Sequence, residues 1–148
     1  MQIKSDIPGT NALVSTEYEG LTPPILSEPK FGTSGDDILV IDKGNQLVFA
    51  GAGNDLIDAG ASPGNNRFYG GTGNDTFTLG EKDTAFGEDG DDRFFATSGG
   101  GNVLTGGSGS DQFWIASAGI SDGANTITDF TLVKMLLVLQ AVAPALAR

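Results

Sequence analysis

A nine-residue pattern recurs through the middle of the chain, and its most regular copy is GGTGNDTFT at residues 70–78. This copy has glycine at positions one, two and four, aspartate at position six and phenylalanine at position eight. Four other segments, which start at residues 32, 50, 87 and 106, keep glycine at position four, aspartate at six and a large apolar residue at eight. The aspartates are Asp37, Asp55, Asp75, Asp92 and Asp111, so one step of 17 to 20 residues contains two nonapeptides.

The intervening nonapeptides mostly lose the aspartate but keep the apolar residue at position eight. An apolar residue every nine positions excludes an amphipathic helix, whose apolar face returns every three or four residues. Glycine-rich halves suit turns and halves such as Thr-Phe-Thr suit short strands, so we predict stacked coils that bury position eight. Trp114, at position nine, is expected to point away from that core and to pack under the end of the roll as a cap, or else to be exposed. The predicted core column is Leu39, Val48, Ile57, Phe68, Phe77, Ala85, Phe94, Leu104, Phe113 and Ile127.

A disordered tract is the alternative for such a composition, since residues 31–130 hold 21 of the 23 glycines. A disordered tract, however, has no reason to place apolar side chains in register in ten successive units. We therefore favour an ordered coil in the presence of metal.

The aspartates of the strict repeats carry the predicted chemistry. Coils stacked about 4.8 Å apart would place these like charges in a column, where each neighbouring pair repels by roughly 0.9 kcal/mol in water. A calcium ion between two aspartates replaces this repulsion with attraction, because calcium binds six to eight carboxylate and carbonyl oxygens. Magnesium is a poorer fit because it demands strict octahedral geometry. Five turns enclose four gaps, so we predict about four Ca²⁺ ions. The predicted ligands are Asp37, Asp55, Asp75, Asp92 and Asp111, with turn carbonyls around Gly35, Gly53, Gly73, Gly90 and Gly109.

The pattern G-G-x-G-x-D-x-U-x resembles the RTX (repeats-in-toxin) family of calcium-binding repeats, and the resemblance covers residues 31–130. It implies an all-β fold, a right-handed parallel β-roll or β-helix solenoid of about five 18-residue coils, with ions between successive turns on one edge. It also implies an extracellular or cell-surface location reached by type I secretion. We expect three parts: a flexible arm or linker at 1–30, the β-roll at 31–130 and an apolar tail at 131–148.

The opposite edge departs from the family pattern, because turns such as 43–46 and 63–66 lack the position-six carboxylate. Stacked asparagine side chains are expected to hydrogen-bond along that edge. Asp83 is an exception there and a candidate for a weaker ion site. Other acidic turn residues are expected to face water as solvating charge: Asp36, Asp42, Asp58, Glu88, Asp89 and Asp91.

The two ends give less information. Residues 1–30 contain four prolines, and no apolar stretch of a secretory signal follows Lys4, so we interpret them as a linker or as a strand added to the first coil. The tail has an apolar run too short and too interrupted for a confident membrane span. It is expected to be a short helix that caps the open end of the roll, or else a truncated or out-of-frame end. No type I secretion signal is recognisable in it.

Charge and composition narrow the function. A net charge of -11 argues against nucleic acids and anionic membranes as partners and for cations. The absence of cysteine and histidine excludes disulfides, the usual zinc sites and histidine-based catalysis. We predict a non-enzymatic calcium-binding module that folds on binding calcium. The alternatives are an accessory module of a polysaccharide-modifying enzyme, or an ice-binding face, for which the Thr-Gly-Asn triplet occurs only at residues 72–74.

Overall fold

The computed structural model describes residues 28–116, 123–130 and 136–140. Every regular element in these ranges is a β-strand, and they contain no helix. It follows that no helix in the described part of the chain is long and apolar enough to cross a membrane.

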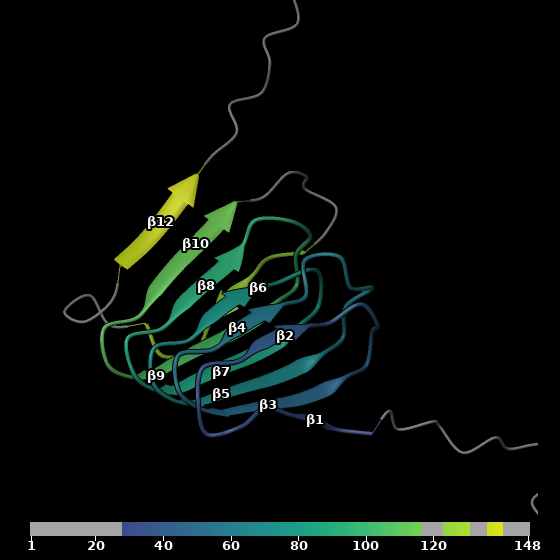
Figure 1. Ribbon diagram of the computed structural model, residues 1–148. Coiled ribbons are helices and arrows are strands. Elements are labelled where there is room, and N and C mark those ends of the chain that lie inside the picture. The colour runs from purple at the N-terminus through teal and green to yellow at the C-terminus, as the bar shows by residue number, and fades with distance from the viewer. Residues whose placement is uncertain (1–27, 117–122, 131–135, 141–148) are drawn as a thin grey trace, which may run out of the picture.

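The strands form two parallel sheets that face each other, and the chain passes from one sheet to the other at every turn (Figure 1). The first sheet has the order β1 (Lys30–Phe31), β3 (Leu47–Ala52), β5 (Arg67–Thr72), β7 (Thr84–Asp89), β9 (Val103–Ser108) and β11 (Thr126–Ile127). The second has the order β2 (Ile38–Val40), β4 (Leu56–Asp58), β6 (Thr76–Thr78), β8 (Arg93–Ala96), β10 (Gln112–Ala116) and β12 (Leu136–Gln140).

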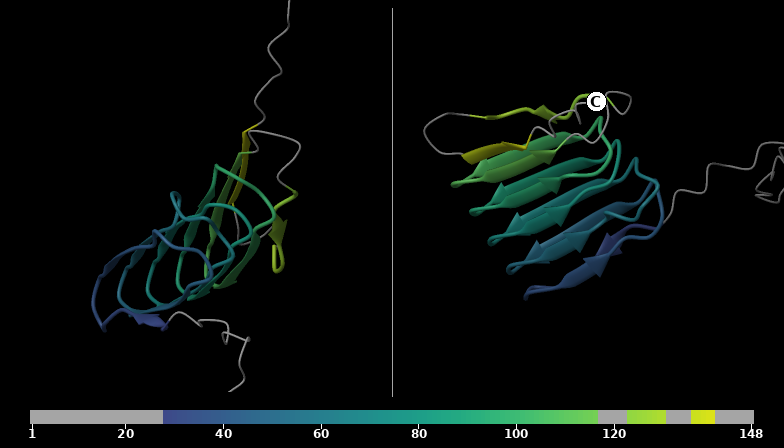
Figure 2. Two further views of the ribbon diagram at one scale, coloured as in Figure 1. Left: turned by 90° about the vertical axis from the view of Figure 1, so that its right-hand side faces the viewer. Right: turned by 90° about the horizontal axis from the view of Figure 1, so that it is seen from above.

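One strand from each sheet makes one coil, and the coils stack as successive rungs (Figure 2). The register matches equivalent repeat positions, such as Leu39 with Ile57 and Ile57 with Phe77. The structure therefore confirms the predicted all-β parallel solenoid of about five coils. The handedness of its coils stays a prediction.

The core fills the narrow space between the two sheets. Eight of the ten predicted position-eight residues are fully buried, and Leu39 and Ile127, near the two ends, pack against them while partly exposed. Three phenylalanines from successive coils, Phe77, Phe94 and Phe113, stack with ring centroids 4.7 and 4.9 Å apart. The nine-residue period alone did not predict a second buried column, which lies two residues further along each strand and so on the same face. It consists of Ile41, Ala50, Ala59, Leu79 and Ala96.

Aromatic side chains also line the outer faces of the sheets. On the first sheet, four rings stack with centroids 4.9 to 5.4 Å apart: Phe31, Phe49, Tyr69 and Phe86. Trp114 lies on the outer face of the second sheet, where it stacks on Phe95 at 4.6 Å. It points away from the core as predicted, but it extends an outer stack and does not sit under the end of the roll.

The prediction of a helix in the tail is wrong for residues 136–140, which form β12 and pair in parallel with β10. An edge strand has unpaired N–H and C=O groups, and another strand satisfies them where a helix would not. β12 therefore extends the second sheet by one strand. The predicted arm up to residue 27 and the rest of the tail lie outside the described residues.

Candidate metal centre

The five predicted aspartates lie in one column at the edge where the chain leaves the first sheet. Each stands at the end of its turn, directly before a strand of the second sheet. The Oδ1 atom of each later aspartate accepts the backbone N–H of the aspartate one coil earlier. The N···O distances are 2.8 Å for Asp37 to Asp55, 2.8 Å for Asp55 to Asp75, 2.8 Å for Asp75 to Asp92 and 3.0 Å for Asp92 to Asp111. We call this column the aspartate ladder.

The second carboxylate oxygen of four ladder residues has no hydrogen-bond donor among the described residues. These buried oxygens are Oδ2 of Asp55, Asp75, Asp92 and Asp111. A buried polar atom without a partner costs about 1–3 kcal/mol, and more when it carries charge. Asp37, at the end of the ladder, differs because its Oδ2 accepts the N–H of Thr33 at 2.6 Å and the hydroxyl of Thr33 at 2.8 Å.

Inward-facing glycines at position one let the free oxygens lie close to the backbone. A Cβ placed on Gly70 would overlap Oδ2 of Asp75 and would lie 2.7 Å from the carbonyl oxygen of Gly87 in the next coil. A Cβ on Gly87 would likewise overlap Oδ2 of Asp92 and lie 2.5 Å from the carbonyl oxygen of Gly106. A carboxylate oxygen and a carbonyl oxygen thus both lie close to the place where a side chain would begin. Acceptors brought together in this way favour a cation or a proton beside them.

Calcium fits this set of donors. In the described part of the chain, no three acidic side chains gather as a metal-holding cluster, so an ion here must combine carboxylate with main-chain oxygens. Calcium accepts that mixture in flexible geometry, and magnesium does so poorly. When bound, calcium would supply the positive charge that the ladder lacks.

The predicted position-four carbonyls form a separate column close to the ladder. Gly53, Gly73, Gly90 and Gly109 all have φ between 114° and 140°, a range that favours glycine. A Cβ on Gly73 would overlap the carbonyl oxygen of Gly53, so the turns stack too closely for any side chain. Carbonyls of position one also lie near the free carboxylate oxygens and were not among the predicted ligands, and the turn carbonyls around Gly35, Gly53, Gly73, Gly90 and Gly109 stay a prediction. Glycine at an inward-facing position is the signal that could have identified the position-one carbonyls.

Asp129 is a second residue that sequence reasoning missed. Its two carboxylate oxygens accept the backbone N–H groups of Gly106 at 3.0 Å and Gly107 at 2.8 Å. It therefore continues the charged edge one coil beyond Asp111. The run Thr-Asp-Phe at 128–130 contains it, and its register against β9 was the available signal.

The outward-facing acidic residues of the turns behave as expected from their positions. Asp36, Glu88, Asp89 and Asp91 are all exposed. Oδ1 of Asp36 accepts the N–H of Asn54 at 2.7 Å, and the N–H of Asp91 is donated to Asn74 Oδ1 at 2.8 Å. These contacts form an outer, solvent-facing row of turn hydrogen bonds.

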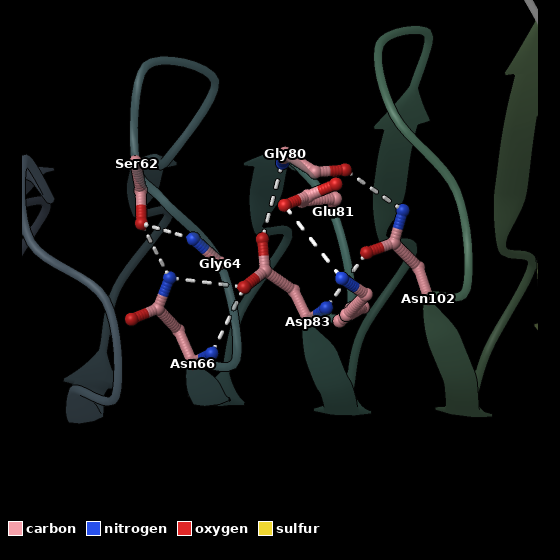
Figure 3. Close-up of polar contacts among 8 residues, drawn as sticks. Ser62, Gly64, Asn66, Gly80, Glu81, Asp83 and Asn102 are labelled. Atoms are coloured by element: carbon pink, nitrogen blue, oxygen red, sulfur yellow. Dashed lines mark hydrogen bonds and ion pairs between the residues drawn. The ribbon is translucent and has the colours of Figure 1, made fainter. Parts of the chain in front are cut away.

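The opposite edge is held by a ladder of amide side chains, as predicted (Figure 3). The N–H of Asn66 is donated to Asp83 Oδ1 at 2.9 Å, and the N–H of Asp83 to Asn102 Oδ1 at 2.8 Å. The amide Nδ2 of Asn66 bonds Ser62 and Asp83, and that of Asn102 bonds the carbonyl of Gly80. We call this column the amide ladder.

Asp83 differs from the aspartate ladder in having donors on both of its oxygens. Oδ1 accepts from the backbone and the side-chain amide of Asn66, and Oδ2 accepts the N–H of Gly80 at 3.1 Å (Figure 3). Asp83 therefore lacks the unpartnered oxygen that is found in the aspartate ladder. The weaker ion site suggested at Asp83 stays a prediction.

Burial raises the pKa of the ladder carboxyl groups. The pKa reaches about 6 for Asp75 and about 7 for Asp92, and it is also raised for Asp55 and Asp111. Loss of solvent is the main cause, and neighbouring carboxylates raise the values further. The N–H groups donated along the ladder lower each pKa without offsetting the loss of solvent. Without metal, the buried carboxyl groups of the aspartate ladder therefore bind protons more readily than aspartates in water do.

Metal-free protein is expected to lose stability as the pH rises from about 4 to about 7. Unfolded aspartates titrate near pH 3.9, so between these values the folded chain binds more protons than the unfolded chain, and its free energy of unfolding falls with pH. The folded fraction of metal-depleted protein, followed by circular dichroism from pH 4 to 8 in a stabilising osmolyte, measures this trend. Constant or rising stability over the interval would contradict the raised pKa values.

Comparison with known proteins agrees with this geometry. The model of the RTX calcium-binding nonapeptide repeat matches four times, at residues 31–63, 40–77, 79–101 and 97–114. Together these matches cover more than half of the chain and all five ladder aspartates. No curated protein and no solved structure matches the chain. With its repeats matched and its turns stacked in register, the chain belongs to the RTX calcium-binding nonapeptide repeat family.

Proposed function

We propose that this chain is a calcium-binding structural module of the cell exterior, without a catalytic role, that folds when calcium binds along the aspartate ladder. The observation that carries the proposal is the set of four buried, unpartnered carboxylate oxygens on one edge. Each would supply one ligand to an ion, which gives up to four Ca²⁺ ions. Secretion and type I export are part of the proposal through the family alone.

Folding on calcium follows from the energetics of the ladder. Without metal, the folded chain must bury four carboxylates that each lack a donor on one oxygen, and it must place them one coil apart. Its core is a single thin layer of side chains, which offers limited compensation. Because the sites require the stacked coils, the free energy of ion binding becomes free energy of folding. Calcium outside the cell would then determine where the chain folds.

Ion counting tests the proposal directly. Metal-depleted protein is mixed with calcium or magnesium at neutral pH, and the bound ions are counted by native mass spectrometry. We expect up to four calcium ions per chain and no comparable series with magnesium, because the latter tolerates this mixed donor set poorly. A chain that bound no calcium, or that bound both ions alike, would contradict the proposed function.

A further inference from the structure

We propose that the four calcium positions are not equivalent, and that the one at Asp55 is markedly weaker because the methyl group of Ala50 keeps its free carboxylate oxygen out of the position that the other three hold. The proposal rests on the proposed function and concerns how calcium is distributed along the ladder. It predicts three tight sites, at Asp75, Asp92 and Asp111, and one weak site nearest the N-terminal end of the roll.

Ala50 stands at position one of the repeat that contains Asp55. In the repeats that contain Asp75, Asp92 and Asp111, position one is a glycine. The first sheet pairs Gly51 with Gly71, so the residue before each, Ala50 and Gly70, stands at the same level of neighbouring coils. The same pairing places Gly87 and Gly106 at this level in the next two coils. Ala50 is fully buried and belongs to the core, so its methyl group faces the interior.

The space into which that methyl group points is the space that the free carboxylate oxygen fills in the other three repeats. At Gly70 and Gly87, an added Cβ would overlap the free Oδ2 of the aspartate in the same repeat. The Oδ2 of Asp55 is also buried and without a donor. The real Cβ of Ala50 therefore keeps this oxygen away from the position its counterparts hold. The methyl group itself supplies no ligand.

The Asp55 rung keeps its structural role even so. Oδ1 of Asp55 accepts the N–H of Asp37 at 2.8 Å, as the other rungs do. The next aspartate towards the N-terminus, Asp37, has its own Oδ2 satisfied by Thr33. At the N-terminal end of the ladder, hydrogen bonds within the protein thus replace part of the contribution of calcium to coil stacking. The calcium ion at Asp55 is therefore expected to bind last and dissociate first.

The test compares stepwise calcium binding in wild-type protein and in Ala50→Gly, by isothermal titration with ion counts from native mass spectrometry. We expect wild type to bind three calcium ions with high affinity and a fourth at least tenfold more weakly. We expect Ala50→Gly to bind four calcium ions with similar affinity. Ala52→Gly is the matched control, since it makes the same change in the same strand at a half-buried residue outside the core, and it should leave the weak step unchanged.

The converse variant, Gly70→Ala, introduces the methyl group beside Asp75 and should convert one tight site into a weak one. Circular dichroism with saturating calcium checks that this variant is folded. Four equivalent ions in wild type, or an unchanged weak step in Ala50→Gly, would overturn the proposal while leaving calcium binding intact. The absence of any bound calcium in both proteins would overturn the proposed function itself.

Discussion

Replacing Phe94 with alanine is expected to lower the free energy of unfolding of the calcium-loaded protein by about 3–5 kcal/mol. Phe94 is fully buried at the centre of the phenylalanine stack, with the rings of Phe77 and Phe113 at 4.7 and 4.9 Å on its two sides. The core is the narrow layer between two hydrogen-bonded sheets, so the surrounding side chains have little freedom to move into the cavity. Small domains are stable by only about 5–15 kcal/mol, so this single change removes a large share. Chemical unfolding in saturating calcium measures the loss.

Phe95→Ala is the matched control, because it removes the same ring from the neighbouring position on the outer face. Phe95 is half-buried and stacks on Trp114 at 4.6 Å. Its replacement is expected to cost clearly less, since no internal cavity forms. Equal losses for the two variants would contradict the assignment of position eight to the core.

Asp92→Asn is expected to stabilise the metal-free protein by about 1–3 kcal/mol at neutral pH, the cost of one unsatisfied buried acceptor, and to remove one calcium ion. The asparagine oxygen can keep the bond from the N–H of Asp75, now 2.8 Å from Oδ1. Its amide nitrogen would face the carbonyl of Gly106, as Nδ2 of Asn102 bonds the carbonyl of Gly80 at 3.0 Å on the opposite edge. The variant is therefore expected to replace a calcium-binding position of the aspartate ladder with hydrogen bonds like those of the amide ladder.

These opposite effects are measured by the concentration of a stabilising osmolyte that folds the metal-free protein, followed by circular dichroism, and by ion counts with calcium. Asp89→Asn is the control, because Asp89 carries the same charge in the same turn but is exposed. It should change neither quantity appreciably. An Asp92→Asn protein that was less stable without metal, or that bound as many ions as wild type, would show that this carboxylate is not a ligand.

Successive coils are hydrogen-bonded at both edges of the roll, but the side chains are mainly amides at one edge and carboxylates at the other. Both use a position-six side chain to accept the N–H of the preceding coil. On the amide ladder, Asn66 and Asn102 supply donors as well as acceptors, so the hydrogen bonds close within the protein. On the aspartate ladder every side chain is an acceptor only, and one oxygen in each of four rungs is left over. Among the described residues, the buried carboxylate oxygens without a donor are therefore confined to one edge.

Much of this arrangement could be predicted from the sequence, because a nine-residue period that pairs into coils fixes which residues stack. The core column, the row of aspartates and the opposite row of amides all follow from that register. The inward position of Ala50 and the position-one carbonyls did not, since they depend on how far each strand extends beyond position eight. The bond between Thr33 and Asp37 is a local side-chain choice that a repeat pattern does not encode.

The C-terminal end shows a different limit. Residues 136–140 carry no repeat, and their apolar character suited a capping helix as well as a strand. What decides between them is the open edge of β10, a feature of the assembled sheet that does not appear in the tail sequence. Asp129 was similarly visible only once its coil was placed against Gly106 and Gly107.

Far-ultraviolet circular dichroism of the metal-depleted chain at neutral pH, during titration with calcium and separately with magnesium, tests the central claim most directly. Calcium held by the aspartate ladder predicts a cooperative gain of β-sheet signal with calcium alone. A chain already folded in chelator, or one that stayed unfolded at saturating calcium, would contradict it and show that metal does not organise this fold.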